Sequence, residues 1–244
     1  MPIYRIAGLR VKIENCSGRT AKQAAAYLDP DQGEDNIDIR INVDASRIAR
    51  AVKKHPELSA SDWDYMLSGD DFYTNLLRFD GMLLHASCVV VDGVAYAFSA
   101  DSGVGKSTHT ALWLEHFGDR AYILNDDKPA IRMIDGTVYA CGTPWSGKYD
   151  DSVPETVPLG GICFLERDTV NRIEKAPVEK AVFNIFSQTV RKLGEKKMEN
   201  LLDVIENIFS KVPLWQLGCT VSDEAVEIAY GAMKRSRTEI LHEI

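Results

Sequence analysis

The chain has 244 residues, enough for one large or two small domains with a sizeable buried core. Hydrophobic residues make up 45% of the sequence and charged residues 26%, the ordinary proportions of a soluble globular protein. A formal net charge of −8 argues against non-specific binding to nucleic acid or to an anionic membrane as the main activity, so we expect neither as a partner.

The first third of the chain carries no recognisable chemical motif. Residues 2–14 and 37–43 alternate apolar and polar side chains, and each segment predicts a half-buried strand. A short helix is expected over residues 20–27, and helical pieces interrupted near Gly69 are expected over residues 59–78. We treat residues 1–80 as an N-terminal region of strands and helices that packs on the core.

The next segment predicts strand, turn, strand, loop and helix in that order. Two apolar runs, residues 89–91 and 94–98, flank Asp92-Gly93, a dipeptide typical of a tight hairpin. After a glycine-containing loop, apolar side chains recur at helical spacing over residues 108–117, and Gly118 suits a C-cap. Strand, loop and helix are the context that a phosphate-binding loop requires.

That loop, Ser-Ala-Asp-Ser-Gly-Val-Gly-Lys-Ser-Thr over residues 99–108, is the most informative stretch of the sequence. Its glycines let backbone N–H groups approach phosphate oxygens, and the helix that follows offers free N–H groups to the same anion. Lys106 supplies a cation for the terminal phosphates, and Ser107 supplies a hydroxyl ligand for Mg²⁺. Ala100 stands where the full P-loop pattern asks for glycine. The predicted nucleotide-binding residues are Ser102, Gly103, Val104, Gly105, Lys106, Ser107 and Thr108.

The rest of the chain adds strands and ends in helices. Strands are expected at residues 122–124, at 130–134 and 137–140 around Asp135-Gly136, and at 160–165 and 214–217. Helices are expected at residues 196–211 and 222–234. Many strands with few helices favour an α/β or α+β fold with a mixed, strand-rich sheet over a long alternating βαβ series.

Candidate catalytic groups lie on both sides of the loop in sequence. Asp126 and Asp127 follow the apolar run that ends at Leu124, with Asn125 between the run and the pair. One carboxylate can ligate Mg²⁺ beside Ser107, and the other can orient or deprotonate an attacking hydroxyl. The alternative is a solvated acidic turn. His85, just before the hairpin, is either a structural residue or a group that holds phosphate.

Further candidates follow the second hairpin. In the turn at residues 142–148, Trp145 would stack on a base or peptide and Lys148 would reach phosphate, or the turn is a surface loop with a packed Trp. Arg167 and Arg172 are either phosphate clamps or solvated charges.

The five cysteines are scattered and form no C-x-x-C pair. Reduced thiols are therefore expected rather than a zinc site or a disulfide framework. With no leader-like or membrane-length apolar run in the sequence, we expect a cytoplasmic protein.

Three segments together resemble the catalytic domain of HPr kinase/phosphorylase and of HPr-kinase-like proteins, which shares the core of the ATP-dependent phosphoenolpyruvate carboxykinases. The resemblance covers residues 80–145 well and the chain through Leu165 more loosely. It implies that residues 81–244 form a P-loop catalytic domain, in which a mixed, strand-rich sheet is flanked by helices. The segments are Leu84-His85-Ala86, Asp101-Ser102-Gly103-Val104-Gly105-Lys106-Ser107 and Asn125-Asp126-Asp127.

The resemblance also implies residue roles and cofactors. Lys106 and the backbone of residues 102–107 would hold the phosphates of ATP, and Ser107 with Asp127 would hold Mg²⁺. Asp126 would act as base on the acceptor hydroxyl, with His85 close to the transferring phosphate. Homo-oligomers are implied as one option, since HPr kinases assemble as hexamers.

The expected function is an ATP-dependent kinase that transfers the γ-phosphoryl group to a hydroxyl, on a Ser of a peptide or protein. No segment matches the Glu-x-Arg-Gly-x-Gly pattern of the bifunctional enzymes, which counts against a phosphorylase activity and against HPr as the substrate. Two alternatives stay open: a nucleotide-binding regulatory protein without turnover, and a small-molecule kinase acting on a serine-like hydroxyl.

Overall fold

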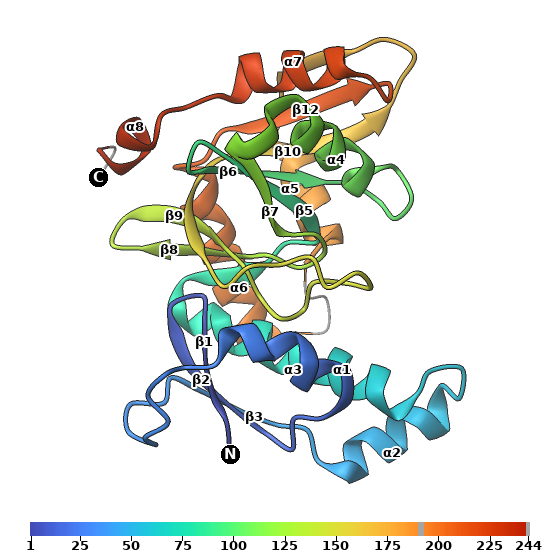
Figure 1. Cartoon of the computed structure of the whole chain (residues 1–244), viewed down its shortest axis with the longest axis vertical. Coiled ribbons are helices and arrows are strands. Elements are labelled where there is room, and N and C mark those ends of the chain that lie inside the picture. The colour runs from blue at the N-terminus through green and yellow to red at the C-terminus, as the bar shows by residue number, and fades with distance from the viewer. Residues whose placement is uncertain (190–192, 243–244) are drawn as a thin grey trace.

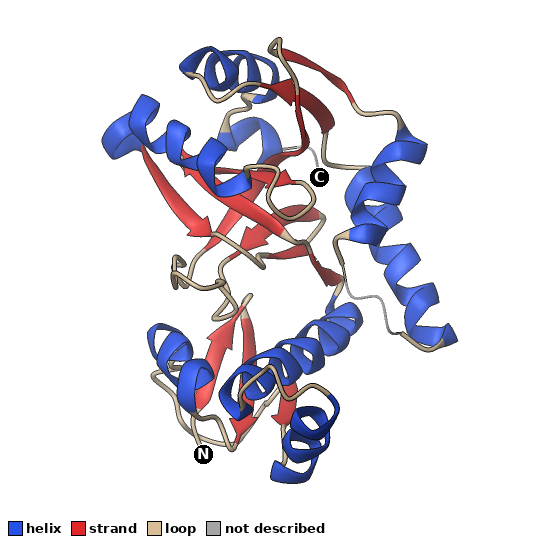
Figure 2. Ribbon diagram, turned by 90° about the vertical axis from the view of Figure 1, so that its right-hand side faces the viewer, coloured by secondary structure: helices blue, strands red, loops and turns tan. Residues whose placement is uncertain are grey.

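Two β-sheets organise the computed structural model, which describes residues 1–189 and 193–242 (Figure 1). The fold is mixed α/β, and helices lie against the sheets in both views (Figure 2). The strands are β1 Ile3–Ile6, β2 Leu9–Glu14, β3 Ile39–Asn42, β4 Gly81–Leu83, β5 Ala86–Val91, β6 Val94–Ser99, β7 Ala121–Asn125, β8 Ala130–Ile134, β9 Thr137–Cys141, β10 Thr156–Arg167, β11 Arg172–Lys175 and β12 Leu214–Cys219. The helices are α1 Gly18–Ala24, α2 Ala45–Lys54, α3 Ala60–Leu76, α4 Lys106–Phe117, α5 Val178–Ser187, α6 Glu195–Phe209, α7 Asp223–Met233 and α8 Arg237–Leu241.

The smaller sheet has the order β1-β2-β3 and is built from the start of the chain. The single strand predicted over residues 2–14 is wrong, because Ala7 and Gly8 both adopt positive φ and turn the chain into a hairpin of β1 and β2. The strand predicted at residues 37–43 is confirmed as β3, which pairs parallel to β2. The predicted domain boundary falls at Asp80, directly before β4, and the division into two domains stays a prediction.

Helix α3 runs without a break through Gly69, so the interruption predicted there is wrong. A capping box of Ser59 and Asp62 starts the helix. The indole of Trp145 packs against the helix at Gly69, where an added Cβ would lie 2.9 Å from the Cδ1 atom of Trp145. The same indole stacks on Phe72 with ring centroids 4.9 Å apart. The glycine therefore serves close packing and not a helix end.

Replacing this glycine is expected to destabilise the fold although alanine is the better helix former. Gly69→Ala should lower the free energy of unfolding by about 1–3 kcal/mol, because the new methyl group overpacks the indole. Gly231→Ala in α7 is the matched control: nothing lies within 4 Å of its added Cβ, and it should stabilise the protein by about 0.5–1 kcal/mol. Denaturant unfolding of both variants measures the signs, and equal signs would contradict the packing explanation.

The larger sheet is mixed, with nine strands that include the order β4-β8-β9-β10-β6-β5-β7. Both predicted Asp-Gly hairpins are confirmed: β5 pairs antiparallel with β6, and β8 pairs antiparallel with β9. At both turns the Asp and the Gly have positive φ, as a two-residue turn of this type requires. The long strand β10 pairs parallel with β6 and with β12, so the carboxyl ends of these three strands lie side by side.

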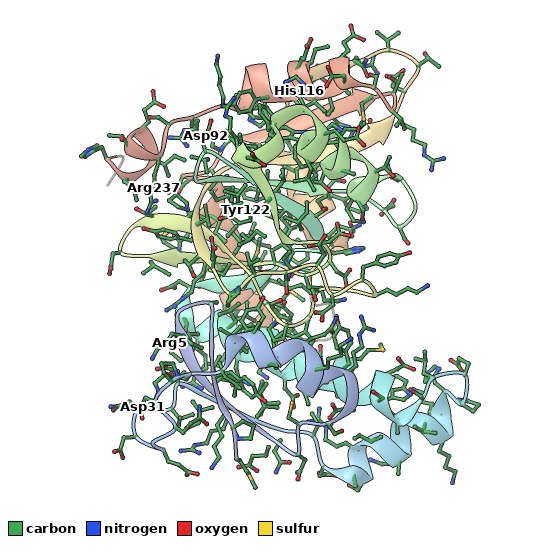
Figure 3. The ribbon with its side chains drawn as sticks, viewed as in Figure 1. Arg5, Asp31, Asp92, His116, Tyr122 and Arg237 are labelled. Atoms are coloured by element: carbon green, nitrogen blue, oxygen red, sulfur yellow. The ribbon has the colours of Figure 1, made fainter. Side chains whose placement is uncertain are left out.

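Helices cover both faces of this sheet. Cys88 and Val90 of β5 face a core with α5 and α6, whereas Val89 and Val91 face a core with α4 and α7. A strand buried on both faces explains the continuous apolar run in the sequence. At the end of α4, His116 (Figure 3) ties this helix to α7, since its Nδ1 lies 2.6 Å from Oδ1 of Asp223.

All five cysteines are free thiols; Cys88, Cys141 and Cys163 are buried, and Cys16 and Cys219 are half-buried. Burial raises the pKa of Cys141 to about 11, so its thiol stays protonated at neutral pH. Within residues 1–189 and 193–242, none of the helices combines the length and the apolar run that crossing a bilayer requires.

Candidate active site

Residues 100–105, here called the glycine loop, connect β6 to α4. Gly103 and Gly105 have φ of +80° and +124°, and nothing lies within 4 Å of a Cβ added to either one. Both glycines are needed for the backbone conformation, and both border open space. Ala100 has no positive φ and its side chain packs in the core with α4, so alanine fits the first position of the loop.

The start of α4 faces the same open space. Its N-cap is Gly105, and no side chain among the described residues caps the helix there. The first N–H groups of a helix have no partner within the helix, and they attract anions. Ser107 and Thr108 are exposed on this first turn. The geometry of loop and helix is therefore suited to an anion with several oxygens.

Lys106 folds back over the glycine loop, with its Nζ donating to the carbonyl oxygen of Ala100 at 2.9 Å. Burial lowers the pKa of Lys106, and the charges of Asp127, Asp126 and Asp101 act against that shift. The ammonium group thus lies in the field of three carboxylates, two of which are the pair predicted from the sequence.

Asn125 shapes the turn that presents this pair. Its side chain is fully buried, and Oδ1 accepts the backbone N–H groups of Asp127 at 3.0 Å and of Lys128 at 2.7 Å. Its Nδ2 donates to the carbonyl oxygen of Thr143 at 2.9 Å. The Asn125 side chain thus accepts hydrogen bonds from the backbone two and three residues ahead, where the strand pairing of β7 has ended. Asp126 and Asp127 are therefore held in a fixed turn and not in a loose acidic loop.

Asp126 is anchored from two neighbouring elements. Ser87 of β5 donates a hydrogen bond to its Oδ1, and the Ser87 hydroxyl lies 2.7 Å from that of Thr110 in α4. The backbone N–H of Asp126 donates to the carbonyl oxygen of Asp151 at 3.0 Å. The Asp126 carboxylate is thus tied to the helix that begins at the glycine loop.

Asp127 lies beside two basic groups. Nε2 of His85 is 3.4 Å from Oδ1, and Nζ of Lys128 contacts Oδ2. Burial acts to raise the pKa of Asp127, but the hydrogen bond from His85 and the charge of Lys128 outweigh it, and the pKa is lowered. Asp127 is therefore anionic at neutral pH. The structure brings His85, Asp127 and Lys106 into one neighbourhood and adds Lys128, which no sequence motif indicates.

The N-terminal region also reaches this cluster. Gly147 has φ of +76°, and an added Cβ would lie 2.9 Å from Cβ of Asp127. Its carbonyl oxygen accepts hydrogen bonds from Arg19 and from Nε2 of Gln23, the latter at 3.1 Å, and its N–H donates to the Tyr65 hydroxyl at 3.1 Å. Side chains from α1 and α3 thus fix the backbone that packs on Asp127.

The other residues singled out from the sequence lie in different environments. Arg167, at the end of β10, donates to the carbonyl oxygens of Val104, at 3.2 Å, and Gly103. Arg172 is 75% exposed and pairs with Asp168 at 3.0 Å, so it behaves as a solvated charge. Trp145 is 1% exposed, which confirms the packed alternative and rules out stacking on a ligand. Lys148 lies 5.7 Å from the ring of its exposed neighbour Tyr149.

Two cavities border the glycine loop. One, of about 340 Å³, extends from the loop along α4 to the end of β12 and is lined by Leu112, Leu165 and Val221 among others. The second, of about 280 Å³, lies toward α5 and includes Asp101, Asn184 and Gln188 in its lining. Val104 and Arg167 border both, so the loop has space on two sides.

Comparisons with known proteins give little. No protein-family model and no curated protein matches the chain. Among solved structures, the HPr(Ser) kinase/phosphatase from Coxiella burnetii matches 62% of this chain and 95% of its own, with 10% sequence identity and a TM-score of 0.36. Both values are low, so this match carries no argument about the family of the chain.

Proposed function

We propose that the chain is an ATP-dependent kinase that transfers the γ-phosphoryl group of Mg-ATP to a hydroxyl, on a Ser of a peptide or protein. The observation that carries the proposal is the meeting of an anion-binding helix start with a fixed carboxylate pair. Lys106 is the first residue of α4, and the charges of Asp127 and Asp126 both act to raise its pKa. Phosphoryl transfer needs these groups together, because its catalysis is mostly positioning and neutralisation of charge.

In this proposal the glycine loop and the first turn of α4 form a P-loop. Backbone N–H groups of residues 102–107 bind the phosphate oxygens, and Lys106 exchanges its bond to Ala100 for the terminal phosphates. Thr108 lines the cavity of about 340 Å³, whose apolar wall of Leu112, Leu165 and Val221 accommodates the nucleoside.

Mg²⁺ fits the donor set beside the loop. The hydroxyl of Ser107 and the anionic carboxylate of Asp127 are hard oxygen ligands of the kind that Mg²⁺ prefers, and they would hold it. The bound ion would neutralise charge on the phosphate oxygens.

Asp126 is the general base of the proposed reaction. It accepts the proton of the acceptor hydroxyl while that oxygen forms a bond to the γ-phosphorus. The bond from the γ-phosphorus to the bridging oxygen breaks, and ADP leaves with that electron pair. Ser87 keeps Oδ1 of Asp126 occupied, so Oδ2 is the oxygen available for the proton. His85 lies near the transferring group through its contact with Asp127.

Calorimetry with Mg-ATP, followed by incubation of the protein with γ-labelled ATP and cell extract, tests the function. We expect binding, and label on a macromolecular acceptor that mass spectrometry places on Ser. Binding without any labelled acceptor would favour a regulatory protein, and label on a metabolite alone would favour a small-molecule kinase. An absence of nucleotide binding would contradict the proposal as a whole.

A further inference from the structure

Gln188, the C-cap residue of α5, bridges the glycine loop and His85. Its side chain is 8% exposed. Oε1 accepts a hydrogen bond from Nδ1 of His85 at 2.7 Å, and Nε2 donates to Oδ1 of Asp101 at 2.9 Å. One amide thus contacts both the glycine loop, at Asp101, and His85. No sequence motif indicates this bridge.

The orientation of this amide is fixed by its partners. The Asp101 carboxylate only accepts hydrogen bonds, so it must face the NH₂ group of Gln188. A reversed amide would place two oxygens against each other. Oε1 therefore faces His85, and Nδ1 of the ring carries a proton toward it.

The backbone of His85 is held as firmly as its ring. Its N–H donates to the carbonyl oxygen of Gln188 at 2.8 Å, and its carbonyl oxygen accepts from the Ser99 hydroxyl at 2.9 Å. With Nδ1 engaged by the amide, the opposite nitrogen Nε2 is the one directed to Asp127, 3.4 Å away. Gln188 thus determines which nitrogen of His85 faces the carboxylate pair.

We infer that Gln188 is a positioning residue that couples Asp101 of the glycine loop to His85 and holds Nε2 of His85 toward the phosphoryl group to be transferred. The inference rests on the proposed kinase function. Because Gln188 acts through His85, its loss should lower turnover of Mg-ATP and leave nucleotide affinity little changed. Partners that orient a catalytic group in this way typically contribute about 10- to 100-fold.

Three variants separate the hydrogen bonds that the amide makes to His85 and to Asp101. Gln188→Met removes both while keeping the length of the side chain. Gln188→Glu still accepts from His85 but has no proton for Asp101, so two carboxylates would meet. Adding Asp101→Asn to Gln188→Glu supplies the missing donor from the other side. Asn184→Ala is the control, since Asn184 lines the same cavity from α5.

The rate of γ-phosphate release from labelled Mg-ATP, with water as acceptor, is measured beside the calorimetric Kd. Both single changes at position 188 should lower the rate by about 10- to 100-fold. The double variant should regain most of it, and Asn184→Ala should retain it. A Gln188 with no role in positioning would leave the rate unchanged in Gln188→Met, and that result, or failure of rescue in a folded double variant, would overturn the inference.

A spectroscopic measurement tests the positioning apart from turnover. In ¹⁵N-histidine spectra assigned with His85→Gln, Nδ1 of His85 should carry a proton, and Gln188→Met should lose this preference. An unchanged spectrum in Gln188→Met would overturn the inference even if the protein is a kinase. If the natural chain fails to bind or turn over Mg-ATP, the proposed function fails, while the ¹⁵N spectra still decide whether Gln188 fixes the proton on Nδ1 of His85.

Discussion

Asp126→Asn is expected to abolish phosphoryl transfer while leaving the binding of Mg-ATP largely intact. A general base contributes roughly 100- to 10,000-fold to such a step, and an amide cannot accept the proton of the attacking hydroxyl. The substitution keeps the geometry, because the amide oxygen can still accept the hydrogen bond from Ser87. Transfer from γ-labelled ATP and the calorimetric Kd, measured on one preparation, give both quantities.

Asp151→Asn is the matched control for this variant. Asp151 is an exposed carboxylate near Asp126. Partial burial raises its pKa most, and the charges of Asp126 and Asp150 raise it further. Its contact with Asp126 uses the backbone carbonyl, which the change leaves in place. Full activity in Asp126→Asn, or an equal loss in Asp151→Asn, would exclude Asp126 as the specific base.

Lys106→Met should lose Mg-ATP affinity by about 10- to 100-fold, the value of one or two hydrogen bonds to a charged group. The loss arises because Asp126, Asp127 and Asp101 then face the phosphates without the ammonium charge between them. The fold should persist, since burial disfavours the charged form of this lysine and methionine keeps the apolar part of the side chain. Titration calorimetry measures the affinity, and the thermal midpoint monitors folding.

Lys54→Met removes an exposed lysine from the end of α2 and controls for the loss of one positive charge. Its affinity for Mg-ATP should match that of the natural chain. A Kd for Lys106→Met that equals the control value would show that this ammonium does not bind phosphate, and would count against the P-loop proposal.

Local signals predicted much of the larger sheet. The Asp-Gly turns after Val91 and Ile134 require positive φ at both residues, and short polar side chains with glycine supply it. The glycine loop could also be predicted, because Gly103 and Gly105 adopt positive φ values that other residues rarely adopt. In each case the cause lies within a few residues of its effect.

What could not be predicted depends on partners far apart in sequence. The break expected at Gly69 followed helix propensity, whereas Trp145 makes glycine necessary at that point of an unbroken helix. No sequence motif indicates Gln188, because its contact with His85 forms only once the end of α5 packs beside a residue far away in the sequence.

The hydrogen bonds that hold Gly147 have a consequence for exchange between related chains. Arg19, Gln23 and Tyr65 belong to the first third of the sequence, yet they fix the backbone that packs on Asp127. A chimera that replaces residues 1–80 with those of a distant homologue would join mismatched halves of one contact surface. A chimera should therefore fold only when the 142–153 loop and the first 80 residues come from the same parent chain. Substitutions in these two segments should covary among related chains.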